Sequence, residues 1–130
     1  MILVDTSVWI QFFRGKNRSL CEHLQELLDL DHVIVAAPVR IEILSGCSRI
    51  DLARLGRLLS ALPIFYPSHN TWEIMERWIE QAISVGKRFG VGDLLIGAIA
   101  AERNAALWSL DQDFILMAHF RWIQLHRMQS

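Results

Sequence analysis

Five short apolar runs, which do not alternate between apolar and polar residues, are the feature that most constrains this chain. They are ILV at 2–4, VIVAA at 33–37, IFY at 64–66, ALWSL at 106–110 and WIQL at 122–125. Apolar strands of this kind are buried on both faces, and helical patterns separate them. We therefore predict a single α/β domain over 1–130, a three-layer α/β/α sandwich whose mostly parallel central sheet has about five short strands.

The segments between the runs predict the helices. They are Ser7 to Arg14, Leu20 to Leu30, Pro38 to about Gly46, Ile50 to Leu62, Asn70 to about Val85, Asp93 to Arg103 and Gln112 to Ala118. Asn70 with Glu73 resembles a capping box at the start of the long helix. In that helix the pattern predicts five inward-facing residues: Met75, Trp78, Ile79, Ala82 and Ile83. Pro63 and Pro67 frame the run 64–66 and predict a strand towards an edge of the sheet.

Composition narrows the class of protein. Hydrophobic residues make up 52% of the 130 residues, with five Trp and six Phe, which favours an apolar surface for self-association or a protein partner. No apolar run approaches the ~20 residues that span a bilayer, and the N-terminus has no signal-peptide pattern, so we expect a cytoplasmic protein without membrane association. Cys21 and Cys47 lack metal-type spacing and read as two buried or half-buried thiols in a reducing compartment.

The formal net charge of −1 gives no global indication of nucleic-acid binding. Gathering four carboxylates in one site, however, would leave −1 + 4 = +3 on the rest of the chain. A weakly basic body around an acidic site is compatible with a phosphodiester substrate.

Four acidic residues can meet at one edge of the predicted sheet. Asp5 and Asp111 directly follow strands, Asp93 begins a helix, and Glu42 lies in the second turn of another. Open parallel sheets bind ligands beyond the carboxyl ends of their strands. Helix capping is the ordinary alternative and suits Asp93 and Asp111. It suits Asp5 less, because Thr6 and Ser7 can cap, and Glu42 lies too far into its helix to cap.

A glycine follows two of these acids at i+4. Gly46 follows Glu42 and Gly97 follows Asp93, and the side chain at i+4 normally covers residue i of a helix. This spacing favours carboxylates left open to an approaching ligand. Close packing of helices is the alternative reason for a glycine there.

Clustered carboxylates repel one another, and a hard divalent cation relieves that repulsion. Ligands that are all oxygen atoms select Mg²⁺ or Mn²⁺ over Zn²⁺. Such a cation can activate water and stabilise the departing oxygen of a phosphodiester.

Four segments together resemble the PIN-domain ribonucleases and, among them, the VapC-type toxins of toxin–antitoxin pairs. They are LVDTSVWI, RIEILSG, VGDLLIGAIA and SLDQDF, in the family's order over essentially the whole chain. The resemblance implies a PIN-like fold, Mg²⁺-dependent endoribonuclease activity, a homodimer and a cognate antitoxin partner. A catalytically weak PIN-like module that binds RNA or protein is the alternative.

The resemblance also implies roles for individual residues. It assigns metal binding and catalysis to Asp5, Glu42, Asp93 and Asp111, with Asp113 as a fifth acid at a position where the family varies. It assigns the orientation of water to the hydroxyls of Thr6, Ser7 and Ser109; the family usually has Thr where this chain has Ser109.

Basic residues are needed to hold RNA. Lys87 and Arg88 precede the loop that leads to Asp93, and Arg40 lies two residues before Glu42, so these three are the candidates. An ordinary solvated charge is the alternative for each. The histidines show no ligand spacing, and Trp9 reads as a core residue rather than a stacking platform for bases.

Overall fold

The structure is a computed structural model that describes residues 1–128. Over this range the elements are β1 (Ile2–Val4), α1 (Thr6–Arg14), α2 (Arg18–Asp29), β2 (Val33–Ala36), α3 (Ala37–Gly46), α4 (Arg49–Ser60), β3 (Ile64–Phe65), α5 (His69–Ser84), α6 (Val91–Glu102), β4 (Ala106–Trp108), α7 (Gln112–His119) and β5 (Gln124–Leu125). Every predicted strand and helix is present within a few residues of its expected bounds. Residues 129–130 of the predicted domain lie outside the described range.

The five strands form one sheet in the order β3-β2-β1-β4-β5, and each recorded pairing is parallel. β1 is central, with Leu3 opposite Ile34 on one side and Leu107 on the other. β3 is an edge strand, as its flanking prolines predict. The parallel α/β class is therefore confirmed.

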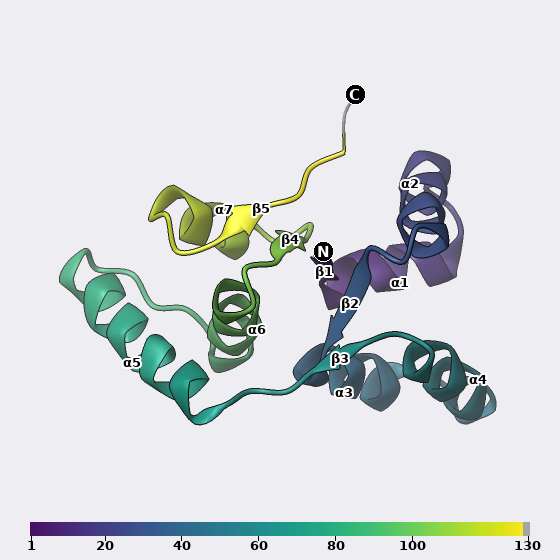
Figure 1. Cartoon of the computed structure of the whole chain (residues 1–130), viewed down its shortest axis with the longest axis horizontal. Helices are drawn as coiled ribbons and strands as arrows, with labels where there is room; N and C mark the ends of the chain where they lie inside the picture. Colours follow the sequence, from purple (N-terminus) through teal and green to yellow (C-terminus); the bar gives the residue numbers. More distant parts are fainter. Residues whose placement is uncertain (129–130) are drawn as a thin grey trace.

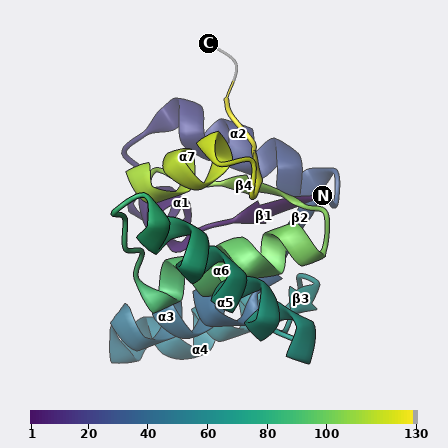
Figure 2. The same ribbon diagram turned by 90° about the vertical axis from the view of Figure 1, so that its left-hand side faces the viewer.

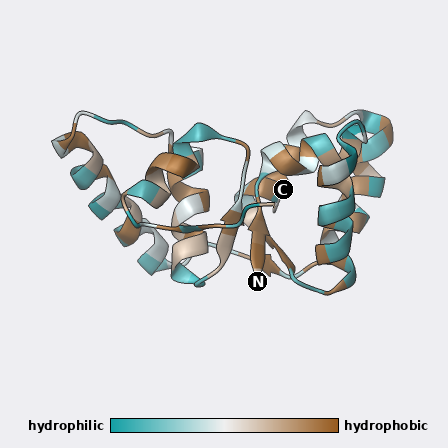
Figure 3. Cartoon of the chain, turned by 90° about the horizontal axis from the view of Figure 1, so that it is seen from above, coloured by the Kyte–Doolittle hydropathy of each residue, from teal (hydrophilic) through white to brown (hydrophobic). Residues whose placement is uncertain are grey.

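Helices cover both faces of the sheet (Figure 1). α1 and α2 lie on one side of β1, and α5, α6 and α7 lie on the other, with α3 and α4 beside β2 and β3. Figure 2 views the molecule from the side of α5, with α5 and α6 in front of the strands. Seen from above, the apolar strands lie at the centre between helices along which hydrophobic and hydrophilic residues alternate (Figure 3). This order places the carboxyl ends of β1 and β4, which are neighbours, beside the starts of α1 and α7.

The core consists of the strands and the inward faces of the helices. Leu3, Ile34 and Leu107 are fully buried, and so is Trp9, as predicted. The thiols of Cys21 and Cys47 are half-buried and free. No helix in residues 1–128 combines the length and the apolar character needed to cross a membrane.

Two predictions for α5 are wrong. The capping box is made by Ser68 and Thr71 rather than by Asn70 and Glu73, so the helix begins one residue earlier. Ile79 and Ile83 are 39% and 47% exposed, and therefore do not face the core. α5 is the outermost helix of its layer and packs against α6, so only one narrow face of it is covered.

Candidate metal centre

The topology brings the predicted acids to one edge of the sheet. Asp5 follows β1 and begins α1, whereas Asp111 lies beyond β4 and begins α7. Asp93 lies in the first turn of α6, and Glu42 is in the second turn of α3. The edge is the carboxyl-end crevice in which open parallel sheets bind ligands.

Asp5 is held by two hydroxyl groups. Its carboxylate oxygen Oδ2 accepts hydrogen bonds from Ser109 Oγ at 2.7 Å and Ser7 Oγ at 2.8 Å. Asp5 is only 6% exposed. The same carboxylate accepts a long bond of 3.5 Å from the Ser7 amide and is the N-cap of α1. The expectation that Thr6 and Ser7 relieve Asp5 of capping is therefore wrong: the Ser7 hydroxyl donates to Asp5, and Asp5 itself caps.

Both serines are anchored in turn by the chain beyond β4. The Leu110 amide donates to Ser7 Oγ at 3.0 Å, and the Asp111 amide donates to Ser109 Oγ at 3.0 Å. These bonds join the ends of β1 and β4 and give the Asp5 carboxylate one defined orientation. Hydrogen bonds of this kind, from a hydroxyl to a carboxylate, are shorter and stronger than bonds between neutral groups.

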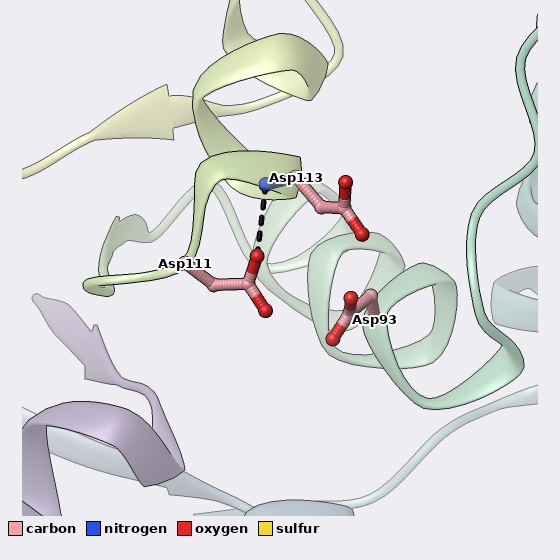
Figure 4. Close-up of side chains that lie close together, drawn as sticks. All are labelled: Asp93, Asp111 and Asp113. Carbon is pink, nitrogen blue, oxygen red and sulfur yellow. Dashed lines mark hydrogen bonds between the residues drawn. The ribbon is translucent and has the colours of Figure 1, made fainter.

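Asp93, Asp111 and Asp113 form a second, tighter group. One carboxylate oxygen from each lies within 4.8 Å of the other two. In Figure 4 the three side chains point towards a common space between the start of α7 and the first turn of α6. Asp111 also caps α7 by accepting a 2.9 Å bond from the Asp113 amide. Asp113, the fifth predicted acid, thus joins this group.

The electrostatics of this group are unfavourable in the absence of a cation. Burial, followed by the charge of Asp111 and the proximity of Asp113 and Asp5, raises the pKa of Asp93 to about 7. Asp93 caps nothing, because α6 begins after Gly90 and no side chain caps it. The capping alternative is therefore wrong for Asp93 and correct for Asp111.

Glu42 lies on the Asp5 side of the centre. Thr6 Oγ1 donates to Glu42 Oε1 at 3.2 Å. Burial and the charge of Asp5 raise the pKa of Glu42, and the Thr6 hydrogen bond opposes this shift. Neither Glu42 nor Asp5 belongs to the compact three-acid group, although the charge of Asp5 acts on both sides.

The two glycines differ. A Cβ at Gly97 would lie 2.9 Å from Met117 Sδ and 3.3 Å from Trp78, so this glycine permits close packing of α6 against α5 and α7. The expectation that Gly97 opens Asp93 to a ligand is wrong, since the glycine faces the core. A Cβ at Gly46 would meet nothing within 4 Å, so the open-face interpretation stands there alone.

The three predicted basic residues differ in whether they lie beside the acidic group. Lys87 Nζ lies 3.3 Å from Asp113 Oδ1 and 5.1 Å from the centroid of the Phe89 ring, so it borders the three-acid group. Arg88 is exposed next to it. Arg40 instead donates to the Gly56 carbonyl oxygen on α4 at 3.3 Å.

Two hollows beside the acids were not predicted, because their walls come from segments far apart in the sequence. One, of about 400 Å³, lies between α1, α3 and α4 and includes Glu42, Asp51 and Phe13. The other, of about 340 Å³, lies beyond β4 and β5 and includes Ser109 and Arg127. No residue motif marks either hollow in the sequence.

The donor set fits a hard divalent cation. The three converging ligands are carboxylate oxygens, and burial together with the neighbouring carboxylates raises the pKa of Asp93. Oxygen ligands of this kind suit Mg²⁺ and Mn²⁺.

Comparisons with known proteins give the family. The family model described as the PIN domain matches residues 2–119. A VapC ribonuclease of Mycobacterium bovis and ribonuclease VapC11 of Mycobacterium tuberculosis are each 29% identical over 133 residues, covering 95% of this chain and 96% of the relative.

Solved structures share the fold. FitAcB from Neisseria gonorrhoeae aligns with a TM-score of 0.82 at 21% identity over 98% of this chain and 97% of that one. VapBC2 from Rickettsia felis, bound to a fragment of its promoter, aligns with a TM-score of 0.77 at 20% identity over 99% and 100%. With the acids at the carboxyl edge of a parallel sheet and a family model that covers most of its length, the chain belongs to the PIN domain family.

Proposed function

We propose that this protein is a Mg²⁺-dependent endoribonuclease that hydrolyses phosphodiester bonds in RNA, and that it is the toxin of a cytoplasmic toxin–antitoxin pair. The observation that carries the proposal is the group of three carboxylates within 4.8 Å, with the Asp93 pKa raised to about 7. Membership of the PIN domain family and curated relatives that are named ribonucleases support the same activity.

The residues take different parts in this proposal. Asp93, Asp111 and Asp113 hold Mg²⁺, or Mn²⁺ as a substitute, and Asp5 and Glu42 complete the acidic wall. The cation supplies Lewis-acid activation of water and charge stabilisation at the phosphate. Ser7 and Ser109 fix the Asp5 carboxylate by their hydrogen bonds, and the Thr6 hydroxyl orients Glu42. These three hydroxyls are also the groups available to orient water.

RNA needs cations beside this negative centre. Lys87 borders Asp113 and Arg88 is exposed beside it, so both can contact phosphates that flank the scissile bond. Arg40 contributes only if it leaves the Gly56 carbonyl oxygen that it now binds.

An antitoxin is the proposed protein partner. Two proteins that share the fold support this partner: a toxin–antitoxin complex from Klebsiella pneumoniae, and VapBC-5 of Mycobacterium tuberculosis, a member of the VapBC family of toxin–antitoxin systems. The hollow next to Glu42 offers a surface for such a partner. Its apolar wall includes Phe13, and its charged residues are the carboxylates Glu42 and Asp51 and one cation, Arg14. This chemistry suits an apolar peptide segment that carries a basic side chain.

A homodimer is the proposed assembly. Trp72, Ile79 and Ile83 are exposed on α5 at helical spacing. α5 itself lies at the periphery of the molecule (Figure 1). A second copy of the chain would bury this stripe. Sedimentation of the wild type and of Ile79→Glu tests the assembly, and a wild type that sediments as a monomer contradicts it.

The activity is tested with purified protein, Mg²⁺ and a mixed RNA substrate. We expect Asp93→Asn and Asp5→Asn to abolish cleavage while circular dichroism retains the helical signal. Asp29→Asn, an exposed acid on α2, is the matched control and should cleave like the wild type. Undiminished cleavage by both site variants contradicts the assignment. RNA binding without turnover in the wild type indicates the non-catalytic PIN-like module instead.

A further inference from the structure

The hollow of about 340 Å³ beyond β4 and β5 shares a wall with the acidic centre. Ser109, whose hydroxyl donates to Asp5 at 2.7 Å, is one of its lining residues. Leu110 is another and directly precedes Asp111. We call this space the β4–β5 hollow. A ligand held by the acids is therefore within reach of it.

The walls of the β4–β5 hollow are apolar and carry no carboxylate. Trp108, Leu110, Ile115 and Leu125 contribute apolar surface, and Arg127 contributes a cation. Leu110 and Ile115 remain 50% and 44% exposed even though they border a concave surface. The hollow next to Glu42 differs, because two carboxylates line it together with one cation, Arg14. Of the two, the β4–β5 hollow is the one whose charge suits a nucleic acid.

Two of the residues that line the β4–β5 hollow, His126 and Trp108, are fixed by contacts with the rest of the fold. His23 Nε2 on α2 and His126 Nε2 after β5 are 2.7 Å apart, and the His126 amide donates to the Leu107 carbonyl oxygen at 2.8 Å. The two imidazole planes differ by 10° with centroids 5.0 Å apart, so the rings meet nitrogen to nitrogen. Trp108 packs edge-on against both rings. A preformed site costs less free energy to occupy than one that must order on binding.

We propose that the β4–β5 hollow receives the base of one nucleotide next to the scissile phosphate, an inference that rests on the proposed ribonuclease function. Leu110 and Ile115 contact the faces of the base, and Arg127 reaches its polar edge or the adjoining phosphate. The acids then act on whichever phosphate follows the seated base. The hollow is thus a determinant of cleavage position, whereas the acids themselves are indifferent to sequence.

The experiment is digestion of a random-sequence RNA pool by the full chain with Mg²⁺, followed by sequencing of the new ends. We expect the wild type to prefer certain nucleotides at one position beside the cut. Ile115→Ala and Arg127→Gln should each weaken that preference about fivefold at the same position, because contacts to a base contribute on this scale. Ile50→Ala, 91% exposed on α4, and Arg57→Gln, on the same helix, are the matched controls and should keep the wild-type profile.

A second measurement uses one RNA that carries the preferred site, with and without an abasic nucleotide at that position. Loss of the base should slow the wild type about fivefold and leave Ile115→Ala almost unaffected. A wild-type profile that is flat at every position, or one that both variants retain, overturns the inference. Variants that cut RNA with the wild-type profile but are no longer inhibited by the antitoxin also overturn the inference. In that case the β4–β5 hollow binds the antitoxin protein rather than a base. A wild type that does not cleave RNA at all contradicts the proposed function itself.

Discussion

The two halves of the acidic centre, one around Asp5 and one around Asp93, differ in how the surrounding residues accommodate a carboxylate. On one side, Asp5 is almost fully buried, and two serine hydroxyls donate to it at 2.7 and 2.8 Å. On the other side, Asp93 faces two further carboxylates, and its pKa rises to about 7. Asp5 is compensated by the fold, whereas Asp93 is not. This difference supports the proposed cation site in the Asp93 half, beside an Asp5 carboxylate that two serine hydroxyls hold in one orientation.

The largest expected effect is on the free energy of unfolding, which replacement of Asp5 and replacement of Asp93 should change in opposite directions. Asp5→Ala leaves two serine hydroxyls without their acceptor and removes the N-cap of α1, so the free energy of unfolding should fall by about 2–3 kcal/mol. Asp93→Ala relieves repulsion and should raise it. Urea unfolding at pH 8 in EDTA measures both, and a destabilised Asp93→Ala would end the distinction between the halves.

Divalent cations should stabilise the wild type through the Asp93 half. At a Mg²⁺ concentration ten times Kd, the free energy of unfolding should rise by about 1.4 kcal/mol. Asp93→Ala should lose this gain, since it lacks one of the three converging ligands. Thermal melts with and without Mg²⁺ or Mn²⁺ check it, with Asp29→Asn as the control that should respond like the wild type. If the cation stabilises Asp93→Ala as much as the wild type, the cation binds at another site.

Lys87 is the internal cation of the Asp93 half, and its removal should separate metal binding from RNA binding. Lys87 Nζ lies 3.3 Å from Asp113 and competes with a metal ion for that oxygen. Lys87→Met should therefore tighten Mn²⁺ binding about threefold while weakening RNA cleavage. Arg88→Met removes a positive charge at the adjacent position and should leave the Mn²⁺ affinity unchanged. Titration calorimetry measures the Mn²⁺ affinity of both variants. If the two variants change this affinity equally, Lys87 acts only as a general surface charge.

The smallest expected effect is on the pH dependence of stability, which should also distinguish Asp93 from Asp5. Because the pKa of Asp93 rises from 3.8 to about 7 on folding, its contribution is fully favourable below pH 3.8 and is lost as the pH rises through about 7. The wild type should therefore lose stability relative to Asp93→Ala between pH 5 and pH 8 in EDTA. Solvent around the half-buried side chain keeps this difference small. Unfolding curves that shift in parallel across this range would contradict it.

Much of the fold and the acids of the site could be predicted from local pattern. Apolar runs buried on both faces identified the five strands, and the order of strands and helices predicted the parallel sheet. The residues that end β1 and β4 were recognisable as site candidates because strand ends share one edge. Local patterns failed for α5, where Ile79 and Ile83 fit the apolar stripe but remain 39% and 47% exposed.

Other properties of the centre depend on residues distant in the chain. Nothing near Gly97 in sequence indicates that Met117 and Trp78 would meet its Cβ, so packing and ligand access could not be separated beforehand. Asp5 and Ser109 lie 104 positions apart, and their hydrogen bond is what allows Asp5 to cap α1 and remain buried. The β4–β5 hollow likewise joins α2, α7 and the segment after β5.

The sequence by itself determined the type of sheet, because the periodicity of apolar residues is a local property. The resemblance of four motifs to the PIN-domain family singled out the acids expected at one edge of it. Only the tertiary structure decided which carboxylates are compensated. The pKa of Asp93 and the hydrogen bonds of Asp5 depend on distances of a few ångströms between elements, and the electrostatic energy of a charge changes steeply over that range.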